Sequence, residues 1–159
     1  MRTVSDIQSF VNETLKDWLV YRSLPVHVRT YMGGSSNGHV CWHIAGKGMN
    51  RYKDMTAIDL NLSEKLLTKG TDESIMMTVA HELMHVIQYN LYSDEELRAM
   101  RGTGVPANKV SDYTPNLLEL QAEVFCINLC GRSHHSFKGA KEQPLYKETL
   151  NSIIHNSLL

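Results

Sequence analysis

Residues 78–88 read Thr-Val-Ala-His-Glu-Leu-Met-His-Val-Ile-Gln, and they place two histidines four positions apart with a glutamate directly after the first. In an α-helix, which turns about 100° per residue, His81 and His85 lie about 40° apart and one turn along the axis. Both imidazoles can therefore reach one metal ion, at the roughly 2.0–2.1 Å of a zinc–nitrogen bond. Glu82 lies at the edge of the same face, where its carboxylate can contact a water bound to that metal. The stretch predicts a metal-binding helix.

The opposite side of this helix is apolar, as packing against a core requires. Chance alone gives only about 0.02–0.03 matches to this histidine–glutamate pattern in a chain of this composition, so a metal site is favoured. The alternative is a structural helix whose histidines are solvated or packed in the core. The apolar stripe consists of Met76, Val79, Ala80, Leu83 and Ile87.

A third ligand must come from elsewhere in the chain, because two histidines do not hold zinc alone. The segment that begins at residue 118 reads Leu-Glu-Leu-Gln-Ala-Glu-Val-Phe and puts Glu119 and Glu123 four apart on one helical face. The small Ala122 between them would let two helices approach closely. Both glutamates are candidate ligands, and the alternative is an ordinary solvated pair on a charged helix face.

The N-terminal part of the chain is expected to form one helix and three strands. Apolar side chains at helical spacing predict a helix over about residues 5–21, with Ser5 or Asp6 as its N-cap. β-Branched and aromatic residues predict strands on both sides of a glycine-rich loop at 33–38, which suggests a hairpin. A third strand follows. The expected strands cover residues 25–32, 38–45 and 56–62.

The C-terminal half is expected to be helical, because capping and termination signals recur along it. The expected fold class is therefore α+β: an N-terminal helix, a small mixed sheet of about three strands, the metal helix beneath it, and a helical C-terminal half that completes the site. The expected helices run over 63–68, over about 72–92, from a Ser93–Glu96 capping box to near Gly102, from Thr114 and Pro115 to about Cys130, and onward from Pro144.

Length and composition indicate one domain over residues 1–159. The 16 Lys and Arg nearly balance the 17 Asp and Glu, so no nucleic-acid partner is expected. No membrane helix is expected, because every apolar run is far shorter than the ~20 residues that span a bilayer. The N-terminal stretch lacks the uninterrupted apolar segment of a secretory signal, which predicts a cytoplasmic protein. Cys41, Cys126 and Cys130 fit buried thiols in a reducing compartment.

The HELMH segment at 81–85, followed at 119–125 by an E-x-x-A-x-x-F helix, resembles the gluzincin metallopeptidases, especially the small intracellular HExxH proteins of the ImmA/IrrE type. The resemblance covers about residues 56–129. It implies a zincin-like fold, one Zn²⁺ per chain and hydrolysis of peptide bonds in a peptide or protein substrate. It also implies that Glu119 is the third ligand and that Glu123, where related enzymes commonly have Asp or Asn, supports a ligating histidine. Met84 stands where the family commonly has Gly.

The resemblance also implies a mechanism in which Glu82 is the catalytic residue. Its carboxylate would take the proton of the metal-bound water during attack on the scissile carbonyl, and then pass it to the leaving amine. The strand at 56–62 would be an edge strand that lies along the cleft and pairs with an extended substrate. The donor to the oxyanion stays open among Tyr113, His134, His135 and His155.

Two alternatives to this interpretation stay open. Ser133-His134-His135-Ser136-Phe137 loosely resembles the HGxxF segment of SprT-like proteases, where a histidine is the third ligand; an ordinary surface loop would also explain the pair. The second alternative is a non-catalytic, zinc-stabilised binding or regulatory module with a zincin fold. Glu82 favours the enzyme, because a structural zinc site needs no general base beside the metal.

Overall fold

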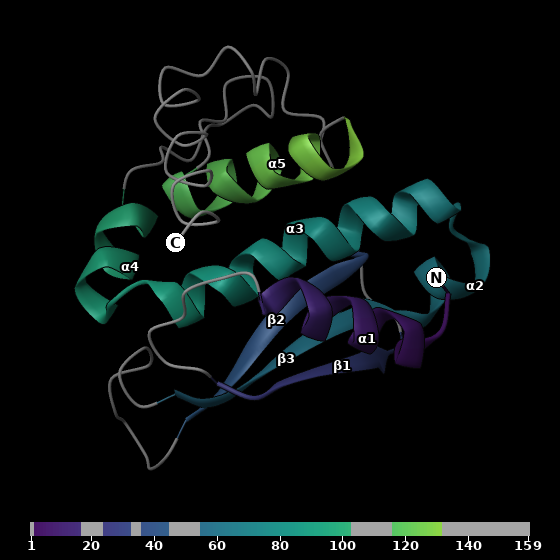
Figure 1. Cartoon of the computed structure of the whole chain (residues 1–159), viewed down its shortest axis with the longest axis horizontal. Coiled ribbons are helices and arrows are strands. Elements are labelled where there is room, and N and C mark those ends of the chain that lie inside the picture. Colours follow the sequence, from purple (N-terminus) through teal and green to yellow (C-terminus); the bar gives the residue numbers. More distant parts are fainter. Residues whose placement is uncertain (1, 17–23, 33–35, 45–54, 103–115, 132–159) are drawn as a thin grey trace.

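A computed structural model of the chain describes residues 2–16, 24–32, 36–44, 55–102 and 116–131, which form five helices and one three-stranded sheet (Figure 1). This confirms the α+β class with a small mixed sheet. The helices are α1 (Val4–Leu15), α2 (Glu64–Lys69), α3 (Asp72–Leu91), α4 (Asp94–Arg101) and α5 (Leu117–Cys130). The strands are β1 (Val26–Tyr31), β2 (Gly38–Ile44) and β3 (Met55–Ser63).

The sheet has the order β1-β3-β2, so its last strand in sequence is its central strand. β3 pairs in parallel with β1 and antiparallel with β2, and Leu60 is opposite both Val28 and Val40. The predicted hairpin between the first two strands is therefore wrong, and so is the predicted edge position of the strand at 56–62. The physical reason is burial: Ile58 and Leu60 are fully buried, and a central strand is covered more completely than an edge strand.

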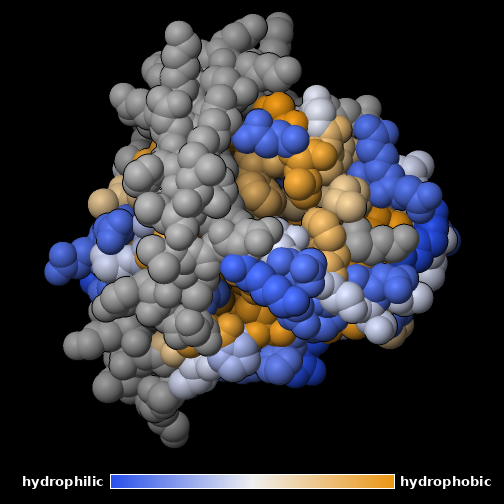
Figure 2. Space-filling view, viewed as in Figure 1, coloured by the Kyte–Doolittle hydropathy of each residue, from blue (hydrophilic) through white to orange (hydrophobic). Residues whose placement is uncertain are grey.

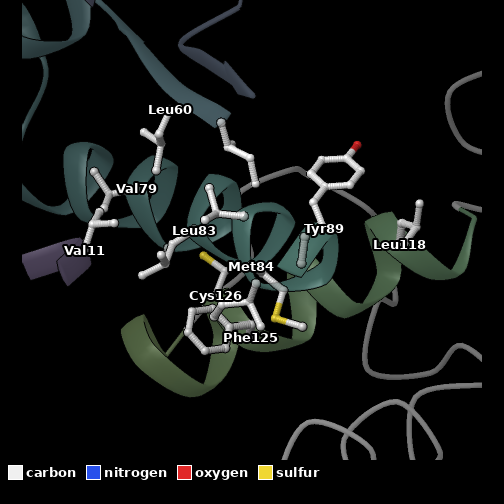
Figure 3. Packing of buried hydrophobic residues seen from close by; sticks show 14 of the residues in the cluster. Val11, Leu60, Val79, Leu83, Met84, Tyr89, Leu118, Phe125 and Cys126 are labelled. Carbon is white, nitrogen blue, oxygen red and sulfur yellow. The ribbon is translucent and has the colours of Figure 1, made fainter. Parts of the chain in front are cut away.

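Helix α3 lies between two layers, with the sheet on one side and α5 on the other (Figure 1). Val79 meets Val11 and Leu60 on the sheet side, whereas Met84 and Cys126 lie between α3 and α5 (Figure 3). The helix is therefore buried almost all round from Met77 to Asn90, rather than along the single apolar stripe that we expected. His81 and His85 of α3 are consequently buried.

Local capping signals account for most helix boundaries. The predicted starts of α2, α3 and α4 are confirmed, with Ser63, Thr71 and Ser93 as N-caps. The N-cap of α1 is instead Thr3, whose hydroxyl accepts from the Asp6 N–H at 3.1 Å, so the expectation of Ser5 or Asp6 is wrong.

The boundaries of α5 also differ from the expectation at one end. Asn116 is its N-cap and accepts from the Glu119 N–H at 2.9 Å, two residues later than the predicted start at Thr114 and Pro115. The helix ends at Cys130 as predicted, because Gly131 takes a left-handed conformation with φ 82°. On the face shown in Figure 2, apolar side chains gather over the C-terminal part of this helix, where Leu129 is 46% exposed.

Several predictions fall on other parts of the chain. The expected last helix from Pro144 and the candidate residues Tyr113, His134, His135 and His155 lie outside the described residues. Within the described residues, no helix combines the length and apolar character needed to cross a bilayer. All three cysteines are free, but Cys41 on β2 is exposed, so the prediction of a buried thiol is wrong there and right for Cys126.

Candidate metal centre

The packing of α5 against α3 brings His81, His85 and Glu119 together. The Nε2 atoms of the two imidazoles are 3.2 Å apart. The Glu119 carboxylate faces both rings, with its Oε2 3.2 Å from His81 Nε2 and its Oε1 3.1 Å from His85 Nε2. One ligand atom from each residue lies within 4.8 Å of the others. Two imidazole nitrogens and a carboxylate oxygen are a donor set that can hold a metal ion.

Glu123 lies behind His81 rather than among the ligand atoms. Its Oε1 is 2.7 Å from His81 Nδ1, and its side chain is fully buried. A carboxylate at this distance pairs with the Nδ1 side of the ring, while Nε2 faces Glu119. The structure therefore gives Glu123 the supporting position that the resemblance implied, one helical turn after Glu119, and not the alternative ligand position.

Gln88 supports the second imidazole, and the sequence analysis missed it. Its Oε1 is 2.8 Å from His85 Nδ1, and its side chain has no exposed surface. The available signal was a glutamine one turn after the second histidine in an otherwise apolar run, because a buried amide needs polar partners. Each imidazole of the cluster thus has a side-chain oxygen close to its Nδ1 atom.

The side chains of His81 and Glu119 shift each other's pKa in opposite directions. Burial alone lowers the pKa of His81, but hydrogen bonds to Glu119 and Glu123 outweigh burial and raise that pKa to about 10. Burial alone raises the pKa of Glu119, but its bonds to His81 and His85 outweigh that effect and hold the pKa far below its usual range. The directions of both shifts favour an ion pair between the His81 imidazolium and the Glu119 carboxylate when no metal ion is bound.

A cavity of about 440 Å³ opens beside the cluster and is lined by all three of its residues. Glu82 also lines it, with a residue exposure of 6%, as does Tyr89, one turn after His85. Glu82 and the three candidate ligands therefore face one common space. The spacing in residues 81–85 predicted a shared face for His81, Glu82 and His85, whereas the place of Glu119 was expected from the resemblance.

Strand β2, and not β3, borders this cavity through Gly38, His39 and Val40. β3 has a paired strand on each side, whereas β2 is at the edge of the sheet. β2 approaches α3 closely at Gly38, where an added Cβ would lie 2.9 Å from Thr78 Cγ2 and 3.2 Å from Glu82 Cγ. Only glycine fits this approach without displacing a neighbour, so Gly38 brings the sheet edge against the helix beside Glu82.

Comparison of the chain with protein-family models, with curated proteins and with solved structures finds no match in any of the three. Function must therefore be inferred from the chemistry of the site, since α+β architecture alone does not specify an activity.

Proposed function

We propose that this chain is a zinc-dependent metalloendopeptidase of the gluzincin type, with a zincin-like fold. The observation that carries the proposal is the convergence of His81, His85 and Glu119 beside a cavity that Glu82 also lines. A structural zinc site is closed by four protein ligands, whereas three protein ligands next to open space are typical of catalytic sites.

The three side chains would hold one Zn²⁺ per chain through two imidazole Nε2 atoms and a carboxylate oxygen. When bound there, zinc would supply Lewis acidity toward a carbonyl oxygen and lower the pKa of water to about 7. The supports at the far ring nitrogens, Glu123 and Gln88, favour this use because they keep both Nε2 atoms directed at Glu119.

Glu82 would move the proton in this reaction. Its position directly after His81 puts it at the cavity, and the glycine at 38 leaves room for its side chain below the edge strand. The carboxylate would accept the proton of the attacking water, hold it, and deliver it to the amine nitrogen of the leaving peptide. A site that only stabilises a fold has no need of such a base.

The substrate would be a peptide or an extended segment of a protein. β2 borders the cavity and is an edge strand, so its backbone N–H and C=O groups can pair with a further strand. Backbone pairing of this kind holds the substrate in extended form and leaves selection to pockets for alternate side chains. This role moves from the strand at 56–62, where we first expected it, to β2.

The metal part of the proposal is tested by measuring zinc per chain by inductively coupled plasma mass spectrometry. The proteins are wild type, Glu119→Ala and Asp59→Ala, purified in parallel without chelator. Asp59 is the matched control because it is also a histidine-bound carboxylate, on β3. We expect about one zinc in the wild type and the control and much less in Glu119→Ala. Full zinc in Glu119→Ala would refute the ligand assignment.

The catalytic part is tested with Glu82→Gln, which keeps the shape of the side chain and removes the base. We expect this variant to retain zinc and to cleave casein about 10²–10⁴-fold more slowly than the wild type. Cleavage at the wild-type rate would refute the mechanism. A zinc-loaded wild type that cleaves neither casein nor a random peptide library would favour the non-catalytic zinc-stabilised module.

A further inference from the structure

Gln88 joins the two helices that carry the metal site. Besides the contact to His85 Nδ1, its Nε2 donates to the backbone carbonyl of Leu118 at 2.8 Å and to Gln121 Oε1 at 3.1 Å. Leu118 is the residue directly before Glu119. A single buried amide therefore contacts one candidate ligand on α3 and the backbone beside another candidate ligand on α5.

The orientation of this amide follows from its partners. A backbone carbonyl can only accept a hydrogen bond, so the amide nitrogen of Gln88 must be the atom that faces Leu118. The amide oxygen must then face His85, and because it can only accept, His85 Nδ1 must carry the hydrogen. The Nε2 atom of a neutral His85 is left with its lone pair, which is the form that binds a metal ion.

A second glutamine reinforces this arrangement. Gln121 Nε2 donates to the Tyr92 hydroxyl at 2.9 Å, so the Oε1 atom of Gln121 is turned toward Gln88. Both amides are nearly inaccessible, with Gln88 0% and Gln121 2% exposed. A buried amide that lost these bonds would leave unsatisfied polar groups, which is costly, so rotation of Gln88 away from His85 is opposed on both sides.

We propose that Gln88 is a positioning residue of the metal site. It fixes His85 as the Nδ1–H tautomer and keeps that ring next to the turn of α5 that carries Glu119. This inference rests on the proposed metal site and adds to it a residue that acts through His85. Loss of an outer partner of this kind weakens metal binding about 10–100-fold in comparable sites.

The test compares the zinc dissociation constants of wild type, Gln88→Met and Asn90→Leu by competition with a chromophoric chelator. Asn90 is a matched control, because it is a buried amide of α3, 2% exposed, that bonds to Val86 O at 2.9 Å and to the Leu24 N–H at 2.7 Å. Both variants lose buried amide bonds, and circular dichroism selects a temperature at which both are folded. We expect Gln88→Met to bind zinc about 10–100-fold more weakly, and Asn90→Leu within about threefold of the wild type.

A second measurement needs no variant. In the zinc-loaded wild type, we expect the buried His85 Nδ1–H to give a slowly exchanging ¹H–¹⁵N resonance with a nuclear Overhauser contact to the Gln88 side chain. Equal zinc affinities of Gln88→Met and Asn90→Leu, or the absence of this resonance and contact, would overturn the inference about Gln88. A wild type that binds no zinc would instead overturn the proposed function, so the two failures are distinguishable.

Discussion

Two clusters of this protein pair a histidine with a carboxylate, and they differ in burial and in what else the carboxylate touches. At the candidate metal centre, His81 lies 3.2 Å from Glu119 and its side chain is 3% exposed. On the sheet, His43 of β2 lies 2.9 Å from Asp59 of β3 and its side chain is 56% exposed. Asp59 also pairs with Arg29 of β1 at 3.3 Å. The shorter contact is therefore not the one at the candidate metal centre.

The difference teaches that a histidine–carboxylate contact alone does not define a metal site. The Asp59 carboxylate is already compensated, because the guanidinium beside it is a permanent cation. Burial acts to raise the pKa of Asp59, but its bonds to His43 and Arg29 outweigh burial and lower it. Glu119 instead faces the Nε2 atoms of two imidazoles, and these three side chains together form a donor set that can hold a metal ion.

Removal of one imidazole from each cluster should give the largest difference in zinc affinity between two variants. We expect His85→Ala to weaken zinc binding by more than about 100-fold, since a lost ligand costs more than a lost outer partner. His43→Ala should leave zinc affinity unchanged. Both are measured by chelator competition. Comparable losses in the two variants would show that the sheet cluster also binds the metal.

The next largest effect is expected at Gly38, where the sheet meets the metal helix. A methyl group at this position would clash with Thr78 and press on Glu82, so Gly38→Ala should lower casein cleavage about 10–100-fold. Zinc content should not change. The control is Gly102→Ala, where an added Cβ would lie an ordinary 3.6 Å from the nearest atoms. Equal rates of casein cleavage by the two variants would show that Gly38 does not help to position Glu82.

Acid should weaken zinc binding, because a proton and a metal ion compete for the same ring. The pKa of His81 in the metal-free protein is raised to about 10, since its bonds to Glu119 and Glu123 outweigh burial. Binding therefore releases a proton, and zinc affinity should fall about tenfold per pH unit below that value. Titration calorimetry in buffers of different ionisation enthalpy measures the proton release. Binding without proton release would contradict the charge state given for His81.

The pKa shifts of His81 and Glu119 also determine how the stability of the protein depends on pH when a chelator removes the metal ion. The raised pKa of His81 contributes stability that is complete below its ordinary value of 6.5 and is lost as the pH rises toward 10. The lowered pKa of Glu119, where the imidazole bonds outweigh burial, contributes stability that is complete above 4.5 and is lost on further acidification. With excess chelator, this cluster should therefore stabilise the protein most between about pH 4.5 and 6.5, as thermal unfolding would show.

The smallest effect is expected at the sheet cluster. Asp59→Asn should lower the free energy of unfolding by about 1 kcal/mol or less, because both of its partners are more than half exposed and solvent screens their charges. Zinc affinity should be unaffected. Urea denaturation in the presence of chelator measures the change. A loss of several kcal/mol would show that this pair is a major stabilising contact of the sheet.

Much of the helical structure could be predicted from local signals, since a cap and the helix that it starts are neighbours in sequence. The Ser93–Glu96 capping box is an example, with both of its reciprocal bonds present. The order of the sheet could not be predicted in this way. The glycine-rich segment at 33–38 is typical of a hairpin, but strand pairing depends on which strand is apolar enough to be central, and that strand is β3.

The residues of the candidate metal centre also differ in whether local sequence or tertiary packing determines their positions. The spacing of His81 and His85 within one helix is a local property, so the sequence predicted their convergence. The position of Glu119 required a resemblance, because it depends on how α5 packs against α3. Gln88 was not predicted, because the role of an amide side chain depends on which groups face it. Its partners are His85 on α3 and the backbone of α5, and only the packing of the two helices brings them together.

The order β1-β3-β2 also bears on how the chain folds. Neither of the first two strands has its sheet partner until residues 55–63 are available, and β1 joins β3 in parallel across the whole intervening chain. The sheet therefore cannot form stepwise from its N-terminal end, because β1 and β3 must first come together across the chain that separates them. During synthesis, β1 and β2 should stay unpaired until β3 emerges, which makes the arrival of β3 the event that commits this domain to its fold.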